Sequence, residues 1–132
     1  MRKFVGFCLV FLLSGMTLIH SQARIIQSQE MRCVSAYANN VNYAPNIRGV
    51  TLNQYSDDSF QFAIYYRDNT PTEYLYLRNG RQQGAGMLYN ADMSSSDGQR
   101  YFNLTGEVIA RGNLIDVFIR QGNMTILSLT LQ

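Results

Sequence analysis

The sequence contains almost none of the side chains that activate a nucleophile or bind a transition metal. Its 132 residues include one His, two Cys and no Trp, and Lys3 is the only Lys. His20 and Lys3 both precede Ala23, so the rest of the chain has neither residue type, and Cys33 is its single thiol. For residues 24–132 this excludes Ser-His-Asp and Cys-His catalytic groups, a Schiff-base lysine and a zinc site of His and Cys ligands. We predict no metal, no cofactor and no enzymatic activity.

Residues 1–23 have the three-part composition of a secretory signal peptide. Two basic residues begin the segment, an apolar run covers residues 4–19, and Ser21 and Ala23 are small. The apolar run is shorter than the roughly 20 residues that a membrane-spanning helix needs. We therefore predict cleavage after Ala23 and secretion of the remaining chain, or its release into the periplasm of a bacterium, without stable membrane insertion.

Removal of residues 1–23 changes the charge of the chain. Arg2 and Lys3 leave with that segment, so 9 of the 11 basic residues remain, all of them Arg, against 9 acidic residues. A neutral chain lacks the excess positive charge of a nucleic-acid-binding protein. The 109 residues that remain of the 132 are enough for one domain, and we predict a single domain over residues 24–132.

The chain after residue 23 alternates apolar and polar residues, and Gly and Asn punctuate the connecting segments. This pattern predicts an all-β domain, a small antiparallel β-sandwich or barrel of roughly eight strands. A helix over Gln27–Ala38 is the one alternative, because Met31, Val34 and Tyr37 have helical spacing. The expected strands are Ile25–Gln29, Arg32–Tyr37, Arg48–Tyr55, Phe60–Arg67, Tyr74–Asn79, Gly86–Asn90, Tyr101–Ala110, Leu114–Arg120 and Met124–Leu131.

Two Gly-Asn pairs divide the last third of the chain into a three-strand meander. A two-residue loop at the first pair, Gly112-Asn113, places Val108 opposite Val117. For the second we predict a three-residue loop, which pairs Val117 with Leu127 and keeps both on one apolar face. The expected apolar face consists of Phe102, Leu104, Val108, Ala110, Ile115, Val117, Ile119, Leu127, Leu129 and Leu131.

The register of the hairpin over residues 60–79 stays open. An even-numbered loop around Pro71 directs Leu75 and Leu77 into the core, whereas an odd-numbered loop turns two tyrosines inward. Tyr and Arg are enriched at the energetically important positions of interfaces. In the even case they share the outer face, and there they are our candidate contacts for a protein or glycan partner: Tyr65, Arg67, Tyr74, Tyr76 and Arg78.

Three smaller features bear on modification and assembly. Asn103 and Asn123 each begin an Asn-X-Thr triplet, so both are glycosylation candidates in a eukaryotic secretory pathway. Cys33 has no internal partner, and it is either a buried thiol, one half of a disulfide between two chains, or a reactive thiol. Residues 92–98 have the alternating oxygen ligands of a calcium loop, but Asn103 and Leu104 stand where its closing acidic residue would be, which favours a solvated turn.

These observations together predict a secreted, non-enzymatic binding module. Its role would be that of an inhibitor, an adhesin-like domain or an assembly component that uses the Tyr and Arg face. The alternative is a carrier of a small apolar ligand inside a closed barrel, with a cavity lined by Phe60, Phe62, Phe102 and Leu104. A carboxylate-dependent enzyme is a third hypothesis, for which the adjacent acids are Asp57 and Asp58.

Overall fold

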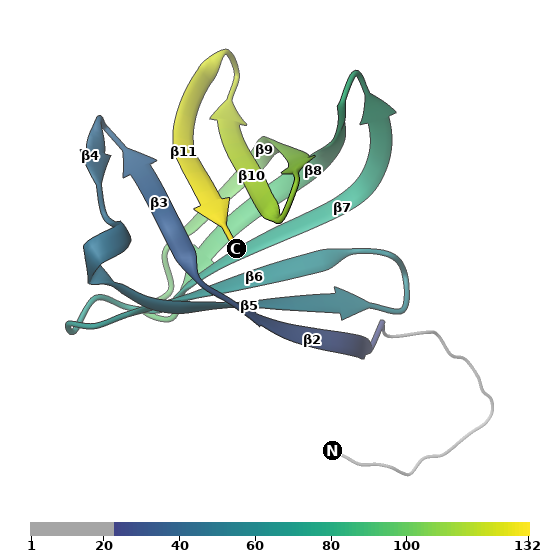
Figure 1. Cartoon of the computed structure of the whole chain (residues 1–132). Coiled ribbons are helices and arrows are strands. Elements are labelled where there is room, and N and C mark those ends of the chain that lie inside the picture. The colour runs from purple at the N-terminus through teal and green to yellow at the C-terminus, as the bar shows by residue number, and fades with distance from the viewer. Residues whose placement is uncertain (1–22) are drawn as a thin grey trace, which may run out of the picture.

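The structure is a computed structural model that describes residues 23–132, which form an all-β domain (Figure 1). Strands make up 73% of it, and a 3-10 turn covers Ala44–Asn46. The predicted signal peptide lies outside the described residues, apart from Ala23. The strands are β2 (Ile25–Met31), β3 (Cys33–Ala38), β4 (Val41–Asn42), β5 (Ile47–Tyr55), β6 (Phe60–Tyr66), β7 (Glu73–Gln83), β8 (Gly86–Ser95), β9 (Arg100–Arg111), β10 (Leu114–Gln121) and β11 (Met124–Leu131).

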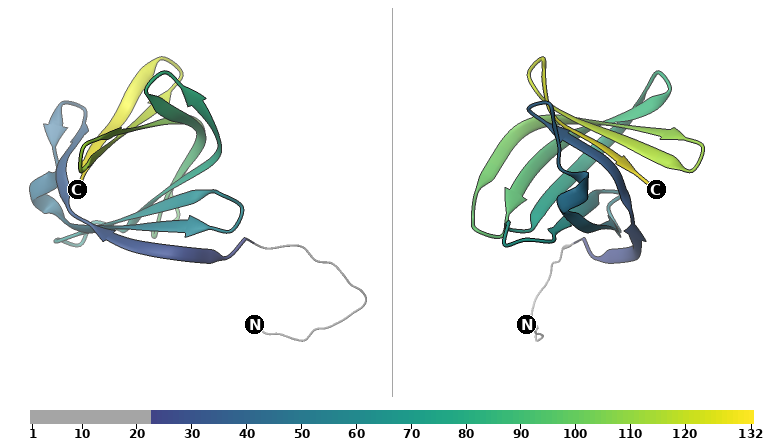
Figure 2. Two further views of the ribbon diagram at one scale, coloured as in Figure 1. Left: turned by 45° about the vertical axis from the view of Figure 1, so that its right-hand side comes forward. Right: turned by 60° about the vertical axis from the view of Figure 1, so that its left-hand side comes forward.

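All ten strands belong to one antiparallel sheet, in the order β2-β5-β6-β7-β8-β9-β10-β11-β3-β4, which is not closed. β2 pairs with β5 and β3 pairs with β11, although only Arg32 separates β2 from β3. Arg32 also exchanges two backbone hydrogen bonds with Gln132, of 3.0 and 2.9 Å. One continuous segment therefore links distant parts of the sheet, and the sheet curls until β10 and β11 lie across from β5 and β6 (Figure 2).

The all-β prediction is confirmed at the level of an antiparallel sheet, with ten strands rather than roughly eight. The helix considered for Gln27–Ala38 is wrong, since this segment forms β2 and β3. Met31 is buried, but Val34 and Tyr37 are 41% and 47% exposed, so the three residues share no buried face. The hydrogen bonds supplied by β5 and β11 outweigh a weak local helical pattern.

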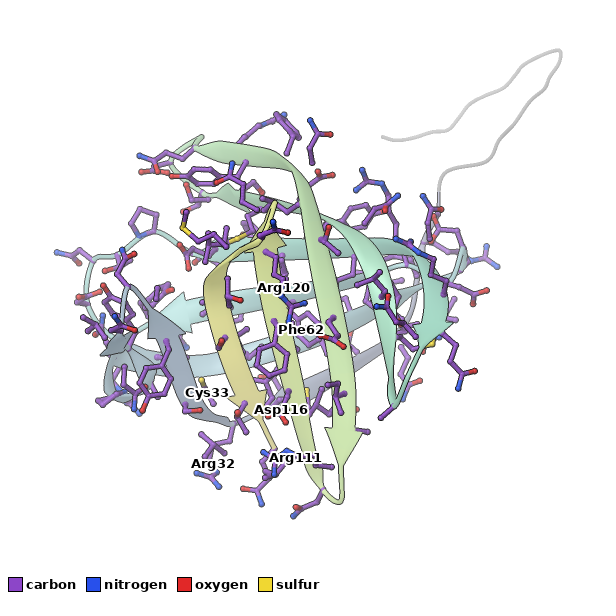
Figure 3. All side chains as sticks on the ribbon, turned by 90° about the horizontal axis from the view of Figure 1, so that it is seen from above. Arg32, Cys33, Phe62, Arg111, Asp116 and Arg120 are labelled. Carbon is purple, nitrogen blue, oxygen red and sulfur yellow. The ribbon has the colours of Figure 1, made fainter. Side chains whose placement is uncertain are left out.

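The inner face of the curl is the hydrophobic core. Phe62 of β6 pairs with Leu75 of β7, and both are buried, so the hairpin over residues 60–79 has the even-numbered loop. Figure 3 shows Phe62 inside the curl, behind β10 and β11. Each such side chain contributes about 1.5–3 kcal/mol on full burial. The large core side chains that are 3% exposed or less are Val50, Phe62, Ile64, Leu75, Leu77, Leu104, Val117, Ile119, Leu129 and Leu131.

The first register predicted for the meander is confirmed, because Val108 pairs with Val117. The second is wrong by two residues, because Val117 pairs with Leu129 rather than with Leu127. The turn is a two-residue loop at Gly122-Asn123, and a β-bulge beside Ile119 then inserts one extra residue on β11. The bulge restores the parity that the short loop would have broken, so the expected leucines still face the core.

Phe102 was expected in the core, but its side chain is 58% exposed. Between the pairs Ala91–Leu104 and Met93–Tyr101 the register of β8 and β9 shifts by one residue. Asn103 has a φ of 59° at this bulge, a left-handed conformation that Asn tolerates better than most residues. The extra residue moves Phe102 to the outer face of the sheet.

Candidate partner-binding surface

The outer face of the sheet carries a shallow hollow of about 680 Å³ over β5 to β9. Gln61, Tyr76 and Asp92 stand directly opposite one another on β6, β7 and β8, where they alternate with core residues. Tyr74 and Ser94 form the next cross-strand pair on this face. We define the tyrosine surface as Tyr55, Gln61, Tyr74, Tyr76, Asp92, Ser94, Arg100 and Phe102, which all line the hollow.

Two tyrosines form the rigid centre of this surface. The rings of Tyr55 and Tyr76 meet edge to face, with centroids 6.2 Å apart and planes at 79°. The Tyr76 hydroxyl donates a hydrogen bond of 3.1 Å to Ser59 Oγ, and the Ser59 hydroxyl donates one of 2.5 Å to Asp57 Oδ1. Burial, followed by the nearby Tyr76 and Asp57, raises the pKa of Tyr55. The phenol of Tyr55 therefore remains neutral at ordinary pH.

Asp57 is a turn-stabilising residue in this arrangement. Hydrogen bonds from the side chain and the backbone N–H of Ser59 lower its pKa, so the carboxylate stays ionised well below neutral pH. Its neighbour Asp58 is exposed in the same turn, with a φ of 67°. A general acid needs a pKa raised toward neutrality, and this geometry gives Asp57 the opposite shift.

The side chain of Arg78 lies next to the tyrosine surface, where it contacts Tyr76 and Asp92. Its guanidinium lies 5.8 Å from the centre of the Tyr76 ring and forms an ion pair of 2.5 Å with Asp92. The two side chains are 38% and 24% exposed, so the pair adds about 0–1 kcal/mol to stability. Its main effect is to hold the cation in place beside the tyrosines.

The structure brings together three of the five predicted contact residues. Tyr74, Tyr76 and Arg78 lie together on the outer face. Tyr65 instead lies under the guanidinium of Arg48, 5.3 Å from its ring centre. The Nε of Arg67 donates to the carbonyl oxygen of Pro45 at 3.2 Å. Both therefore belong to a separate region beside the start of β5.

Sequence reasoning missed six residues of the surface: Tyr55, Gln61, Asp92, Ser94, Arg100 and Phe102. Tyr55 and Asp92 reach it through strand pairings that no local pattern reveals, and Phe102 reaches it through the bulge at Asn103. Gln61 could have been found, because it alternates with the phenylalanines of β6.

Asn103 and Asn123 are the glycosylation candidates, and Cys33 is the candidate for a disulfide between two chains. Asn103 and Asn123 are both exposed, one at the bulge of β9 and one in the last turn. Cys33 is half-buried, and its thiol donates to the carbonyl oxygen of Ser35 at 3.3 Å. Burial raises the pKa of this thiol to about 11, so it is protonated at neutral pH and a weak nucleophile. Glycosylation and an interchain disulfide remain predictions.

Residues 23–132 contain neither a metal-binding cluster nor a membrane-spanning helix. There, no three His, Cys, Asp or Glu side chains lie close enough together to share a metal ion. Within the same range no helix combines the length and hydrophobicity that crossing a membrane requires.

A smaller hollow of about 170 Å³ opens inside the curl and is almost entirely apolar. Phe60 and Phe62 line it as predicted for a ligand cavity, but Phe102 and Leu104 do not. Its lining comes from the six successive strands β5 to β10: Leu52, Phe60, Phe62, Leu77, Tyr89, Val108 and Ile115.

Comparison of the chain with protein-family models, with curated proteins and with solved structures gave no match.

Proposed function

We propose that this protein is a secreted, non-enzymatic binding module that recognises another protein through the tyrosine surface. One observation carries the proposal: neighbouring strands assemble tyrosines, an arginine and an exposed phenylalanine around one concave area. Tyr and Arg dominate the binding energy of protein interfaces, because Tyr offers a large area with few rotatable bonds and Arg a planar set of donors. Strands hold these groups more rigidly than loops would.

The geometry favours a protein over a glycan as the partner. Sugar rings stack on the open faces of aromatic side chains, but Arg78 lies over Tyr76, and Tyr55 packs against the same ring. Phe102 is 58% exposed and offers no polar atom, so it suits the apolar side chain of a protein partner. A role as inhibitor, adhesin-like domain or assembly component is compatible with this surface.

The test compares capture of partners by the purified protein and by three variants. Phe102→Ala and Tyr74→Ala each shorten one side chain of the tyrosine surface. Tyr37→Ala is the matched control, since Tyr37 is 47% exposed on β3 and does not line the hollow. Proteins from the native extracellular medium are captured and quantified by mass spectrometry, and their affinities are then measured by titration.

A protein that binds the wild type and Tyr37→Ala but binds the two surface variants about tenfold or more weakly supports the proposal. Circular dichroism must show the same β spectrum for all four proteins. Equal capture by all of them refutes it. A parallel glycan array covers the other partner class: glycan binding that depends on Tyr74 would replace the protein proposal with a glycan-binding one.

The apolar hollow supports a second candidate function, transport of a small apolar ligand. Its volume of about 170 Å³ matches apolar cavities that hold a molecule of benzene size. We expect benzene or toluene to raise the melting temperature of the wild type, because a ligand that binds only the folded state stabilises it. Val108→Phe fills the hollow and should abolish the shift. An unchanged melting temperature of the wild type would eliminate this candidate.

A further inference from the structure

A third hollow, of about 390 Å³, lies within the curl at the opposite end of β5 and β6 from the apolar hollow. Ile47 begins β5 and Ile64 is near the end of β6, whereas Leu52 and Phe60 line the other hollow. Core side chains such as Val50 separate the two spaces. The apolar part of its lining includes residues of β3, β5, β6 and β11: Ala36, Ala38, Ile47, Ile64, Leu127 and Leu129.

Glu73 places a carboxylate on the inner face of the sheet at this hollow. It is the cross-strand partner of Ile64, which is 1% exposed, so its side chain points to the same side as the core. The Tyr66 hydroxyl donates a hydrogen bond to Glu73 Oε1. Burial and then this bond raise the pKa of Tyr66, which keeps the phenol a donor at all ordinary pH values. Glu73 therefore has a fixed position and room for further donors.

The carboxylates at this hollow form no ion pair with an Arg side chain of residues 23–132. In residues 23–132 the ion pairs of Arg side chains involve Asp92, Glu107 and Asp116, and none involves Glu73. Asp68 adds a second carboxylate to the lining, where it accepts hydrogen bonds from Asn46 Nδ2 and the Thr70 N–H. Of the Arg residues within 23–132, none lines the hollow. A negatively charged rim thus adjoins an apolar interior.

We propose that this hollow binds a small amphipathic primary amine, with its ammonium group on Glu73 and its apolar part against Ile64 and Leu129. An ammonium group supplies the hydrogen-bond donors and the positive charge that Glu73 and Asp68 lack. The volume lies within the range of small-molecule sites, which are mostly apolar with a few convergent polar groups. This site is separate from the tyrosine surface and does not depend on the function proposed for it.

The experiment titrates the purified protein with three probes of one shape by calorimetry. Phenethylamine carries an ammonium group, phenylethanol a neutral hydroxyl, and phenylpropionate a carboxylate. We expect saturable binding of phenethylamine, weaker binding of phenylethanol and no binding of phenylpropionate. Absence of saturable phenethylamine binding, or equal affinity for phenylpropionate, overturns the proposal.

Two variants locate the binding. Glu73→Gln removes the charge but keeps an oxygen that can accept from Tyr66, so it should weaken phenethylamine binding about tenfold or more and leave phenylethanol binding unchanged. Glu107→Gln is the matched control, because Glu107 pairs with Arg120 on the outer face. If Glu73→Gln does not fold, Ala38→Leu decides the question by filling the hollow. Unaltered amine binding in Glu73→Gln, or in Ala38→Leu, refutes the assignment.

Discussion

Replacement of Asp116 by Asn should destabilise the protein in a pH-dependent way. Asp116 lies on the outer face of β10 but is only 8% exposed. Its carboxylate accepts hydrogen bonds from Arg111 Nε at 2.5 Å and Nη2 at 3.2 Å, and from the Thr130 hydroxyl at 2.8 Å. Figure 3 shows Arg111 beside Asp116. Asn cannot accept the paired donors of the guanidinium, and its bond to Thr130 loses the charge.

The size of the destabilisation by Asp116→Asn follows from the hydrogen bonds that the substitution changes. Hydrogen bonds to a charged group contribute about 1.5–3 kcal/mol and those between neutral groups about 0.5–1.5 kcal/mol. Arg111 is 56% exposed, so its ion pair is screened by water and adds little. We therefore expect Asp116→Asn to lower the free energy of unfolding by about 1–2 kcal/mol at neutral pH.

The pH dependence has a definite sign. The Arg111 guanidinium, and then Thr130, lower the pKa of Asp116 in the folded state below the ordinary value of 3.8. Its stabilising contribution is complete above that ordinary value and disappears as the pH falls through the folded pKa. The difference between wild type and Asp116→Asn should thus be constant near neutral pH and shrink below pH 3.8.

Urea unfolding at a series of pH values tests both expectations. Asp58→Asn is the matched control, because Asp58 is exposed and its φ of 67° suits Asn. A variant as stable as the wild type at neutral pH would refute the argument. A destabilisation that persists unchanged at the lowest pH would also refute it, since it would then not arise from the charge.

Three further predictions use other parts of the fold. Gly106→Ala should lower the free energy of unfolding by about 1–3 kcal/mol, because its Cβ would come within 2.7 Å of Leu77 Cδ2 in the core. Gly49→Ala is the matched control, because the space around its Cβ is open, and it should change the free energy of unfolding by less than about 0.5 kcal/mol. Urea unfolding measures both variants, and similar effects at both positions would contradict the packing argument. Gly122→Ala should cost about 1 kcal/mol, because the φ of 61° favours Gly, and a neutral result would show that the turn adapts. Iodoacetamide should alkylate Cys33 about a hundredfold more slowly in the native protein than in urea, given the rise of its pKa from 9.0 to about 11, and comparable rates would refute the burial effect.

Local patterns in the sequence predicted most strands but few of the register shifts. The alternation of Phe62, Ile64, Leu75 and Leu77 is a local signal, and the structure follows it. The bulge on β11 leaves no such signal, because either turn geometry keeps the leucines buried, and only the pairing differs. Burial thus fixes which side a residue faces and leaves its partner undetermined.

The tyrosine surface, too, could be predicted only in part from local sequence patterns. Tyr74 and Tyr76 were predicted to share a face, since they stand two residues apart on one strand. The alternating pattern of β9 predicts Phe102 in the core, but a bulge at Asn103 inverts the parity of the strand, and a single Asn gives little warning of it. Tyr55 joins the surface through the strand order, which depends on contacts between distant residues.

The pairing of β3 with β11 has a consequence for the order of events during synthesis. Arg32 meets Gln132 across 100 positions of the chain, and contacts between such distant residues form late and slowly. A nascent chain that emerges N-terminus first can form the hairpins from β5 onward one after another, but until β11 exists β3 can pair only with the short strand β4. Until that moment the polypeptide remains incompletely folded, a state that a translocation channel can still accept.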